Sequence, residues 1–318
     1  MKPESNGYRI PVLLLIFNRP RTTAAVLKAV RKVRPRFLYI AADGPRDGNA
    51  PDEDSCKATR KVVELIDWPC EVRTLFRAEN LGCRDAVSQG ITWFFEHVEK
   101  GIVLEDDCVP TEEFFRYCED LLQRYDADGR VMHIAGVNLS QEDWSREESY
   151  TFSSYTPIWG WATWRRAWQQ YDADLNRLEE FDREGGYDAA FSTRKERVSR
   201  RMLYEIVRGR KIDTWDYQWN FAVLANGGLS IIPATSMVRN IGFGDDATHT
   251  RKTWDHVQHS LNKNTLLPLR HPRAVKVDDE YDRGYFRTVT QVASPLWRLI
   301  LKRYLPVRLL RGLKRLMT

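Results

Sequence analysis

Short apolar runs alternate with amphipathic segments between residues 10 and 135, and this alternation restricts the chain to few folds. Runs typical of buried strands occur at 10–17, 37–42, 71–76, 102–104 and 131–135. Segments with helical spacing of apolar residues lie at 20–33, after a polar loop at 46–55, at 84–98 and at 112–125. Strands and helices that alternate in this way form a mostly parallel sheet covered by helices on both faces. The pattern therefore predicts an α/β fold.

Beyond residue 135 the pattern becomes irregular and rich in aromatic residues. Tryptophan, tyrosine and phenylalanine crowd residues 144–168. Helical spacing returns at 194–208 and at 217–225, and a strand is expected at 229–232. With 318 residues the chain is long enough for one large α/β domain or two small ones.

The basic residues are concentrated at the C-terminal end. The net charge is +5, but residues 295–318 hold seven basic residues and no acidic one, which leaves 42 basic against 44 acidic residues elsewhere. Bulky apolar and basic residues alternate in this tail, a composition typical of a helix lying in an anionic membrane surface. A helix docked on the protein with its basic face in water has the same composition, and both interpretations stay open. Nucleic acid is not an expected partner, because charges balance elsewhere and no recognition motif is present.

The cysteines and the N-terminal residues bear on the cellular compartment. The five cysteines are odd in number and lack the paired spacing of metal ligands. Residues 1–9 are too polar for a signal peptide, and the early apolar run 12–17 is too short to span a bilayer. These features predict a cytoplasmic protein in a reducing compartment.

Three consecutive carboxylates end the apolar run 101–104: Glu105, Asp106 and Asp107. Open α/β sheets bind ligands at the carboxyl ends of their strands, where Asn18 and Asp43 are also expected. Adjacent anionic groups at the edge of a core repel one another unless cations or hydrogen-bond donors compensate them. A bound divalent metal ion would provide that compensation, and a solvated acidic turn is the alternative.

Further short motifs follow in a recognisable order. An Asn-Arg pair (18–19) ends the first strand, Leu-Glu-Asp-Asp (104–107) ends the fourth, and an acidic and aromatic helix start (112–115) comes next. Trp-Gly-Trp (159–161), Trp-Asp (215–216) and Gly-Phe-Gly (242–244) segments come later. In this order the motifs resemble the metal-dependent glycosyltransferases of the GT-A fold, and most closely those of the animal N-acetylglucosaminyltransferase I type. The resemblance covers about residues 10–250.

The resemblance implies a fold and an activity. Residues 8–135 would form the Rossmann-like half that binds a nucleotide sugar, 136–285 the irregular, aromatic-rich half of the same domain that binds the acceptor, and 286–318 a basic amphipathic C-terminal helix. The implied enzyme is a hexosyltransferase-type glycosyltransferase. It would move a sugar from a nucleotide-diphosphate sugar, expected to be UDP-linked, to a glycan or lipid-linked acceptor, and inversion is expected. Retention stays open, because both stereochemical classes share the fold and the metal motif.

The metal site follows from the same resemblance. A divalent ion that bridges both phosphates stabilises the charge on the departing nucleoside diphosphate. Asp107 would ligate this ion directly, while Glu105 and Asp106 would contact the ribose or hold the water shell of the ion. Mn²⁺ or Mg²⁺ suits such an all-oxygen site better than Zn²⁺. His249 would be a second, late-arriving ligand of the metal or pyrophosphate, and a plain surface turn is its alternative.

Five residues would bind the nucleotide, if the resemblance holds. Asn18 and Arg19 follow the first strand, where the cation would offset pyrophosphate charge. Asp43 would accept a hydrogen bond from the uracil imide. Asn80 would pack near the ribose and sugar, and Arg84 would reach the phosphates. Each of these short sequences is also a common turn or helix start.

An inverting transfer also needs a base that takes the proton of the acceptor hydroxyl. The resemblance assigns this role to Asp216, and Asp213 is a local rival. Trp161 would line the donor-sugar pocket, because aromatic rings suit the C–H faces of a pyranose. Trp215 and Trp219, four residues apart, are expected to pack in the core.

The chain departs from the animal enzymes in its expected membrane contact. Those enzymes carry an N-terminal membrane helix, whereas the candidate contact here is the tail 295–318. This layout predicts a bacterial enzyme of polysaccharide biosynthesis, cytoplasmic and peripheral on the inner membrane face. Donor specificity for N-acetylglucosamine does not carry over.

Two other functions are consistent with an α/β half that bears metal-binding carboxylates. A sugar-nucleotide nucleotidyltransferase should carry a glycine-rich loop after the first strand to hold a triphosphate, and residues 17–21 contain no glycine. A catalytically silent module that binds nucleotide sugars or glycans would have no rate to lose when the base is replaced.

Overall fold

The structure is a computed structural model of the chain and describes residues 7–140, 144–242, 265–291 and 295–304. Its elements follow one another as β1 (Val12–Ile16), α1 (Pro20–Val30), β2 (Phe37–Ala42), α2 (Ala50–Arg60), η1 (Lys61–Leu65), β3 (Glu71–Phe76), α3 (Gly82–His97), β4 (Lys100–Glu105), β5 (Cys108–Pro110), α4 (Glu112–Arg124), β6 (Val131–Ala135), β7 (Tyr150–Ser153), β8 (Trp161–Trp164), α5 (Arg165–Trp168), α6 (Leu178–Arg183), α7 (Gly186–Ala190), α8 (Arg194–Arg208), α9 (Asp216–Ala225), β9 (Leu229–Pro233), β10 (Val238–Asn240), α11 (Asp279–Tyr285), η2 (Phe286–Thr290) and α13 (Leu296–Tyr304).

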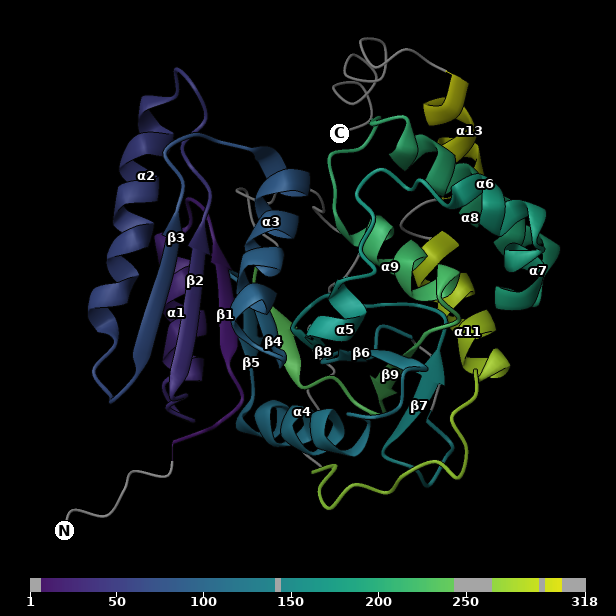
Figure 1. Cartoon of the computed structure of the whole chain (residues 1–318), viewed down its shortest axis with the longest axis horizontal. Helices are drawn as coiled ribbons and strands as arrows, with labels where there is room; N and C mark the ends of the chain where they lie inside the picture. The colour runs from purple at the N-terminus through teal and green to yellow at the C-terminus, as the bar shows by residue number, and fades with distance from the viewer. Residues whose placement is uncertain (1–6, 141–143, 243–264, 292–294, 305–318) are drawn as a thin grey trace.

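Within the described residues, eight strands form one mixed sheet in the order β3-β2-β1-β4-β8-β6-β9-β7. The strands from β3 to β4 are all parallel, and β9 is parallel to β6. Only β8 and β7 run against their neighbours. Figure 1 shows β1, β2 and β3 at one end of this sheet and β7 at the other. The predicted α/β fold with a mostly parallel sheet is confirmed.

Helices cover both faces of the sheet, which explains why β1 is apolar throughout. Val12 and Leu14 share one core cluster with Val26 of α1, whereas Leu13 shares a second cluster with Phe94 of α3. Strands buried on both faces are continuous apolar runs instead of alternating ones. This double cover leaves the carboxyl ends of β1, β2 and β4 as an edge where polar side chains gather.

The predicted loop at 46–55 is wrong in its second half, because α2 begins at Ala50. The Asn49 side chain caps this helix by accepting the backbone N–H of Asp52 at 3.3 Å. Pro51 lies in the first turn, where its missing N–H costs nothing. The sequence placed a helix after this loop, at Val62, Val63 and Leu65. These three residues lie in the short helix η1, which follows α2.

The aromatic-rich region contains strands that the sequence did not predict. The four residues of β8 are all buried, and the strand lies antiparallel between β4 and β6, with Trp161 opposite Val103 and Ala135. β5 and β10 form a separate antiparallel pair beside the end of β4. The large sheet contains strands from residues 8–135 and from residues 136–285. The predicted division into a nucleotide-binding half, an acceptor-binding half and a tail from residue 286 stays a prediction.

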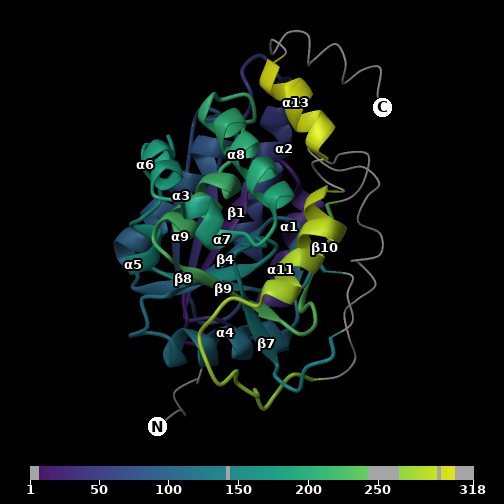
Figure 2. The same ribbon diagram turned by 90° about the vertical axis from the view of Figure 1, so that its right-hand side faces the viewer.

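The C-terminal segment packs on the second part of the sheet and on α8. Ser153 and Ser154, at the end of β7, donate hydrogen bonds to Asp282 of α11. α13 is a basic amphipathic helix, as predicted, and it lies along α8 in both Figure 1 and Figure 2. None of the described helices has the length and apolar composition needed to cross a bilayer. All five cysteines are free thiols.

Candidate functional site

The parallel register of β1 and β4 brings a cation and two carboxylates together at the edge of the sheet. Leu15 pairs with Glu105, so Arg19, the residue before α1, lies beside the residues that follow β4. The Arg19 guanidinium donates to Oδ2 of Asp107 from Nη1 at 2.9 Å and to Oδ2 of Asp106 from Nε at 3.3 Å. Its Nη2 donates to Oδ1 of Asp106. Arg19 thus forms an ion pair with each aspartate.

Burial explains the electrostatics of this ionic cluster. Asp106 is 3% exposed, and burial raises the pKa of its carboxyl to about 6 although Arg19 opposes the rise. Burial lowers the pKa of Arg19, but the two aspartates outweigh it and raise that pKa above its ordinary value. The sequence predicted that a cation must compensate the acidic residues, and Arg19 supplies part of that charge. Its predicted contact with a pyrophosphate stays a prediction.

Glu105, the last residue of β4, keeps an unfilled acceptor position. Its Oε1 is buried and has no hydrogen-bond partner among the described residues. Burial, then the charges of Asp107 and Asp106, raises the pKa of this carboxyl to about 8. Buried polar atoms in native proteins are nearly always hydrogen-bonded, so an exception calls for an explanation such as an absent ion or ligand.

Asp107 is held from its other side by the strand β10. The backbone N–H of Ile241 donates to the carbonyl oxygen of Asp107 at 2.8 Å, and Asn240 Nδ2 approaches its Oδ1 at 3.4 Å. A Cβ atom at Gly242 would clash with the Asp107 carboxylate. The sequence analysis missed Asn240, although it lies two residues before the glycine of the Gly-Phe-Gly motif.

The donor set at the end of β4 suits a hard divalent cation. Glu105, Asp106 and Asp107 offer only oxygen atoms, the ligands that Mg²⁺ and Mn²⁺ prefer, and Oε1 of Glu105 is unfilled. Among the described residues, no group of three or more histidine, cysteine, aspartate or glutamate side chains is arranged to hold a metal ion. His249 lies outside the described residues. An ion ligated by Asp107 would compete with Arg19 for the same carboxylate.

Asp43 and Asn80 bind each other and join the end of β2 to the start of α3. The Asp43 carboxylate accepts from Asn80 Nδ2 at 2.9 Å and from the backbone N–H groups of Gly44, Leu81 and Gly82 at 2.9, 3.0 and 3.2 Å. Burial raises the pKa of Asp43, and these backbone donors oppose the rise. Four donors match the roughly four acceptor positions of a carboxylate. The predicted contacts of both residues with uracil and ribose stay predictions.

Asn18 points toward the start of α2. Its Nδ2 donates to Oδ1 of Asp52 at 2.6 Å, and Arg46 Nη2 donates to the same oxygen at 2.9 Å. These hydrogen bonds, led by that of Arg46, lower the pKa of Asp52. Asn18 therefore positions the loop between β2 and α2, and its predicted role at the nucleotide stays a prediction.

Arg84 and Asp213 meet at the start of α3. Asp213 accepts the backbone N–H groups of Cys83 at 3.1 Å and of Arg84 at 3.0 Å, which satisfies free donors of the helix. The Arg84 guanidinium donates to Asp174 Oδ1 at 2.6 Å and to the carbonyl oxygen of Ala173 at 2.9 Å. Its predicted reach to the phosphates stays a prediction, and the role of Asp213 that the structure shows is to cap α3.

Asp216 begins α9 and accepts the hydroxyl of Thr214. The charge of Asp216 contributes to the raised pKa of Glu105, which places the predicted base within electrostatic range of β4. Cys83 lies in the same region, because burial, followed by the charges of Glu105 and Asp216, raises the pKa of its thiol. The sequence offered no signal for Cys83, since a single cysteine at a helix start has no motif.

Trp161 lies in the core, so its expected place in the wall of a donor-sugar pocket is corrected. Its side chain is fully buried and stacks on His133 at 5.0 Å and on Trp215 at 5.7 Å between ring centroids. The reason is its position on the central strand β8, between β4 and β6. Trp215 and Trp219 are 2% and 0% exposed, which confirms their predicted core packing.

Comparison with known proteins gives only distant matches. No protein family and no curated protein matches the sequence. Among solved structures, UTP-bound UGPase from Acinetobacter baumannii is 8% identical with a TM-score of 0.38, over 70% of this chain and 85% of that chain. A UDP-glucose pyrophosphorylase complexed with UDP-glucose is 10% identical with a TM-score of 0.31, over 51% and 78%. The 4-diphosphocytidyl-2C-methyl-D-erythritol synthase from Anaerococcus prevotii is 8% identical with a TM-score of 0.33, over 62% and 99%.

The names of these structures agree better with the nucleotidyltransferase alternative than with glycosyl transfer. At such low identity and TM-scores, however, the likeness carries no argument about the function of this chain. The function has to be argued from the residues of the site.

Proposed function

We propose that the chain is a metal-dependent glycosyltransferase. Its donor would be a nucleotide-diphosphate sugar, expected to be UDP-linked, and its acceptor a glycan or a lipid-linked sugar. The observation that carries the proposal is the ionic cluster of Arg19, Asp106 and Asp107 at the carboxyl ends of β1 and β4, next to the unfilled oxygen of Glu105. Two aspartates that share one guanidinium leave excess negative charge where α/β sheets bind ligands.

Each residue at this edge has a role in the proposal. Asp107 would ligate a Mn²⁺ or Mg²⁺ ion, and Glu105 and Asp106 would hold its water shell or the ribose. When bound, the cation would stabilise the negative charge that develops on the departing diphosphate. Arg19 already neutralises part of the buried charge, and it would stay beside the diphosphate as a second cation.

The transfer itself needs a base. The bond between the anomeric carbon and the diphosphate oxygen breaks, and its electron pair leaves with the nucleoside diphosphate. The acceptor oxygen forms the new bond to that carbon and gives its proton to Asp216. Asp213 is the weaker candidate, because both of its carboxylate oxygens hold the start of α3. A positioned base of this kind contributes about 10²- to 10⁴-fold in rate.

The connection between β1 and α1 argues against nucleotidyl transfer. The helix begins at Pro20 directly after Asn18 and Arg19, and the connection contains no glycine. A triphosphate is usually cradled by successive backbone N–H groups of a glycine-rich loop. Nucleotidyl transfer nevertheless stays the alternative to be tested.

The test is a panel of nucleotide sugars screened for thermal stabilisation with and without Mn²⁺. A ligand that binds only the folded state raises the melting temperature, and the rise grows with the logarithm of ligand concentration over Kd. We expect a Mn²⁺-dependent rise with UDP-sugars that disappears in the Asp107→Ala protein. A rise with nucleoside triphosphates as large as that with UDP-sugars, or larger, would contradict the proposal in favour of nucleotidyl transfer, because such an enzyme binds both its triphosphate substrate and its nucleotide-sugar product.

A stabilising nucleotide sugar that is never consumed, with any acceptor or with water, would instead identify a binding module. The Asp216→Asn protein then separates the two cases. An enzyme loses its rate and keeps its donor affinity, whereas a binding module has no rate to lose.

A further inference from the structure

Four large apolar side chains are exposed along one short helix, α13. Trp297 is 49% exposed, Ile300 43%, Leu301 39% and Tyr304 73%. Their spacing of three, four and seven residues places them on the same face of the helix. We name this face the outer stripe of α13.

The opposite face of α13 fixes how the helix lies on the protein. Leu299 is 1% exposed, and Arg303 Nη1 pairs with Glu205 of α8 at 2.9 Å. Lys211 Nζ donates to the carbonyl oxygen of Lys302 at 3.1 Å, at the C-terminal end of the helix, where a cation is favourable. These contacts hold α13 against α8 (Figures 1 and 2), and the exposed fractions of its four side chains show that the outer stripe faces solvent.

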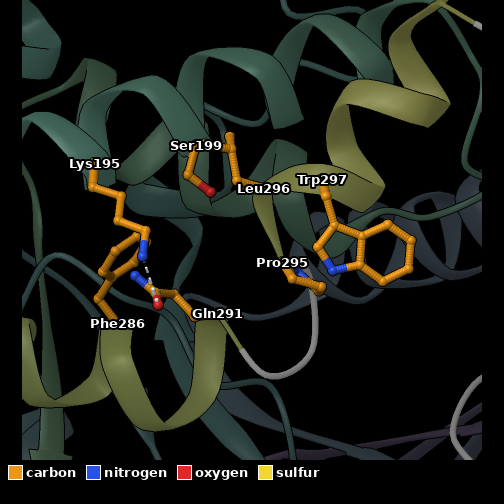
Figure 3. A pocket seen from close by; sticks show the side chains of 7 residues that line it. All are labelled: Lys195, Ser199, Phe286, Gln291, Pro295, Leu296 and Trp297. Carbon is orange, nitrogen blue, oxygen red and sulfur yellow. Dashed lines mark hydrogen bonds between the residues drawn. The ribbon is translucent and has the colours of Figure 1, made fainter.

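A pocket of about 210 Å³ lies between α8 and the first turn of α13. Leu296 lies beside Ser199 of α8, and Trp297, whose indole points away from Ser199, also lines the pocket (Figure 3). Lys195 Nζ, on the opposite wall, donates to Gln291 Oε1 at 3.1 Å. Leu299 is the buried residue of α13, whereas Trp297 keeps about half of its side chain exposed although it borders the pocket.

The charged residues of α13 itself are all basic. Arg298 is exposed, and its guanidinium lies 5.2 Å from the ring centroid of Trp297. Residues 295–318 include seven basic residues and no acidic one. An exposed stripe with tryptophan and tyrosine, bordered by basic residues, is the composition of helices that lie in the interface of an anionic bilayer.

We infer that the outer stripe of α13, with Arg298 beside it, docks on an anionic lipid surface. The apolar side chains would enter the headgroup region, and the basic residues would pair with lipid phosphates. This inference does not rest on the proposed function, because it involves no residue of the nucleotide site. If both hold, the docked face would bring the enzyme to a lipid-linked acceptor.

The experiment is co-sedimentation of the full chain with vesicles, without nucleotide or metal. One set of vesicles is phosphatidylcholine alone, and the other contains phosphatidylglycerol as well. We expect binding to the anionic vesicles only, weakened by salt because exposed charges are screened. Absence of binding to the anionic vesicles would overturn the inference, whatever the nucleotide site does.

Variants of the outer stripe test its residues directly. Replacing Trp297 and Ile300 together by serine should reduce binding to anionic vesicles by about tenfold or more, since interfacial affinity scales with buried apolar area. Arg298→Glu should reduce it several-fold through charge alone. Leu65→Ser, at an apolar residue that is 54% exposed elsewhere, is the matched control and should bind like the parent.

The variants also distinguish the other occupants of this face. Undiminished vesicle binding in both stripe variants would overturn the inference, as the tail beyond residue 304 would then act alone. Self-association of the parent that the serine variant abolishes, without vesicle binding, would identify the face as a contact between copies and equally overturn it. All substituted side chains are exposed, so we expect the melting temperatures of the variants to match that of the parent. A match shows that lost vesicle binding is not caused by unfolding.

Discussion

Two of the regions that bury carboxylates differ in the hydrogen-bond partners of those carboxylates. In the second half, Asp282 accepts the hydroxyl of Ser153 and the backbone N–H of Ser154, the latter at 3.0 Å. At the edge of β4, Asp106 and Asp107 share one guanidinium, and Oε1 of Glu105 has no partner among the described residues. Carboxylates with filled acceptor positions hold a fold together, whereas unfilled ones are available to a ligand.

The pKa values alone do not separate the two regions. Burial is the main cause that raises the pKa of Asp282 to about 7 and that of Glu105 to about 8. Protein donors then oppose the rise at Asp282, while further negative charges add to it at Glu105. The two regions therefore differ in the groups around their carboxyl groups: hydrogen-bond donors at Asp282, and further negative charges at Glu105.

The largest effect is expected for the proposed base. Asp216→Asn should lower the transfer rate by about 10²- to 10⁴-fold and leave donor affinity unchanged, because an amide cannot take the proton of the acceptor. The rate is measured as release of nucleoside diphosphate. Asp213→Asn is the matched control and should keep most of the rate while losing about 1 kcal/mol of stability through the cap of α3. A larger rate loss in Asp213→Asn than in Asp216→Asn would identify Asp213 as the base and contradict the assignment of Asp216.

Asp107→Asn should weaken Mn²⁺-dependent donor binding by roughly a hundredfold, since one partner of a buried charge pair is lost. Titration calorimetry with and without Mn²⁺ measures this effect. Asp282→Asn removes a buried carboxylate each of whose oxygens has a protein donor, and should leave donor affinity intact. Equal losses of donor affinity in Asp107→Asn and Asp282→Asn would contradict the view that only the carboxylates at the edge of β4 bind the ligand.

Gly242→Ala should weaken donor binding about tenfold, comparable to the loss of a residue that orients a metal ligand. The added Cβ would displace the carboxylate of Asp107, which is the flexible end of a side chain, so the melting temperature should change little. Gly129→Ala adds a Cβ in open space and serves as the control. Donor affinity that is unaffected by Gly242→Ala would show that the position of Asp107 does not limit binding.

The smallest effect on donor binding is expected at Asp282, whose titration should change only the pH dependence of stability. Its pKa of about 7 in the folded chain exceeds the ordinary value of about 3.9 for an unfolded aspartate. The folded state therefore binds more protons, and this stabilisation is complete below about pH 4 and lost as pH rises to about 7. The slope is at most about 1.4 kcal/mol per pH unit. Denaturant unfolding of Asp282→Asn should show a flatter pH profile, and a profile as steep as that of the parent would refute the assignment.

Local features of the chain were readable from the sequence. The residue ranges 37–42 and 194–208 match β2 and α8, because apolar runs and helical spacing are local signals. The expectation that Asn18, Asp43 and the acidic residues lie at one edge also followed from the rule for parallel strands. What the sequence could not indicate is pairing over long separations.

Three residues illustrate this limit. Arg19 pairs with carboxylates 87 and 88 positions away, which no spacing rule connects. Trp161 is buried because β8 is inserted between two other strands, and a four-residue strand gives little periodic signal. Asn240 reaches Asp107 only through the pairing of β10 with β5.

The most direct test of the central claim identifies which bond of a nucleotide sugar is broken. The protein is incubated with Mn²⁺, a UDP-sugar that stabilises it, a panel of glycan and lipid-linked acceptors, and pyrophosphate, and the products are followed by phosphorus NMR. Our account predicts that UDP appears, that the rate does not depend on pyrophosphate, and that Asp216→Asn abolishes it. The appearance of UTP and a sugar 1-phosphate, only when pyrophosphate is present, would contradict the account.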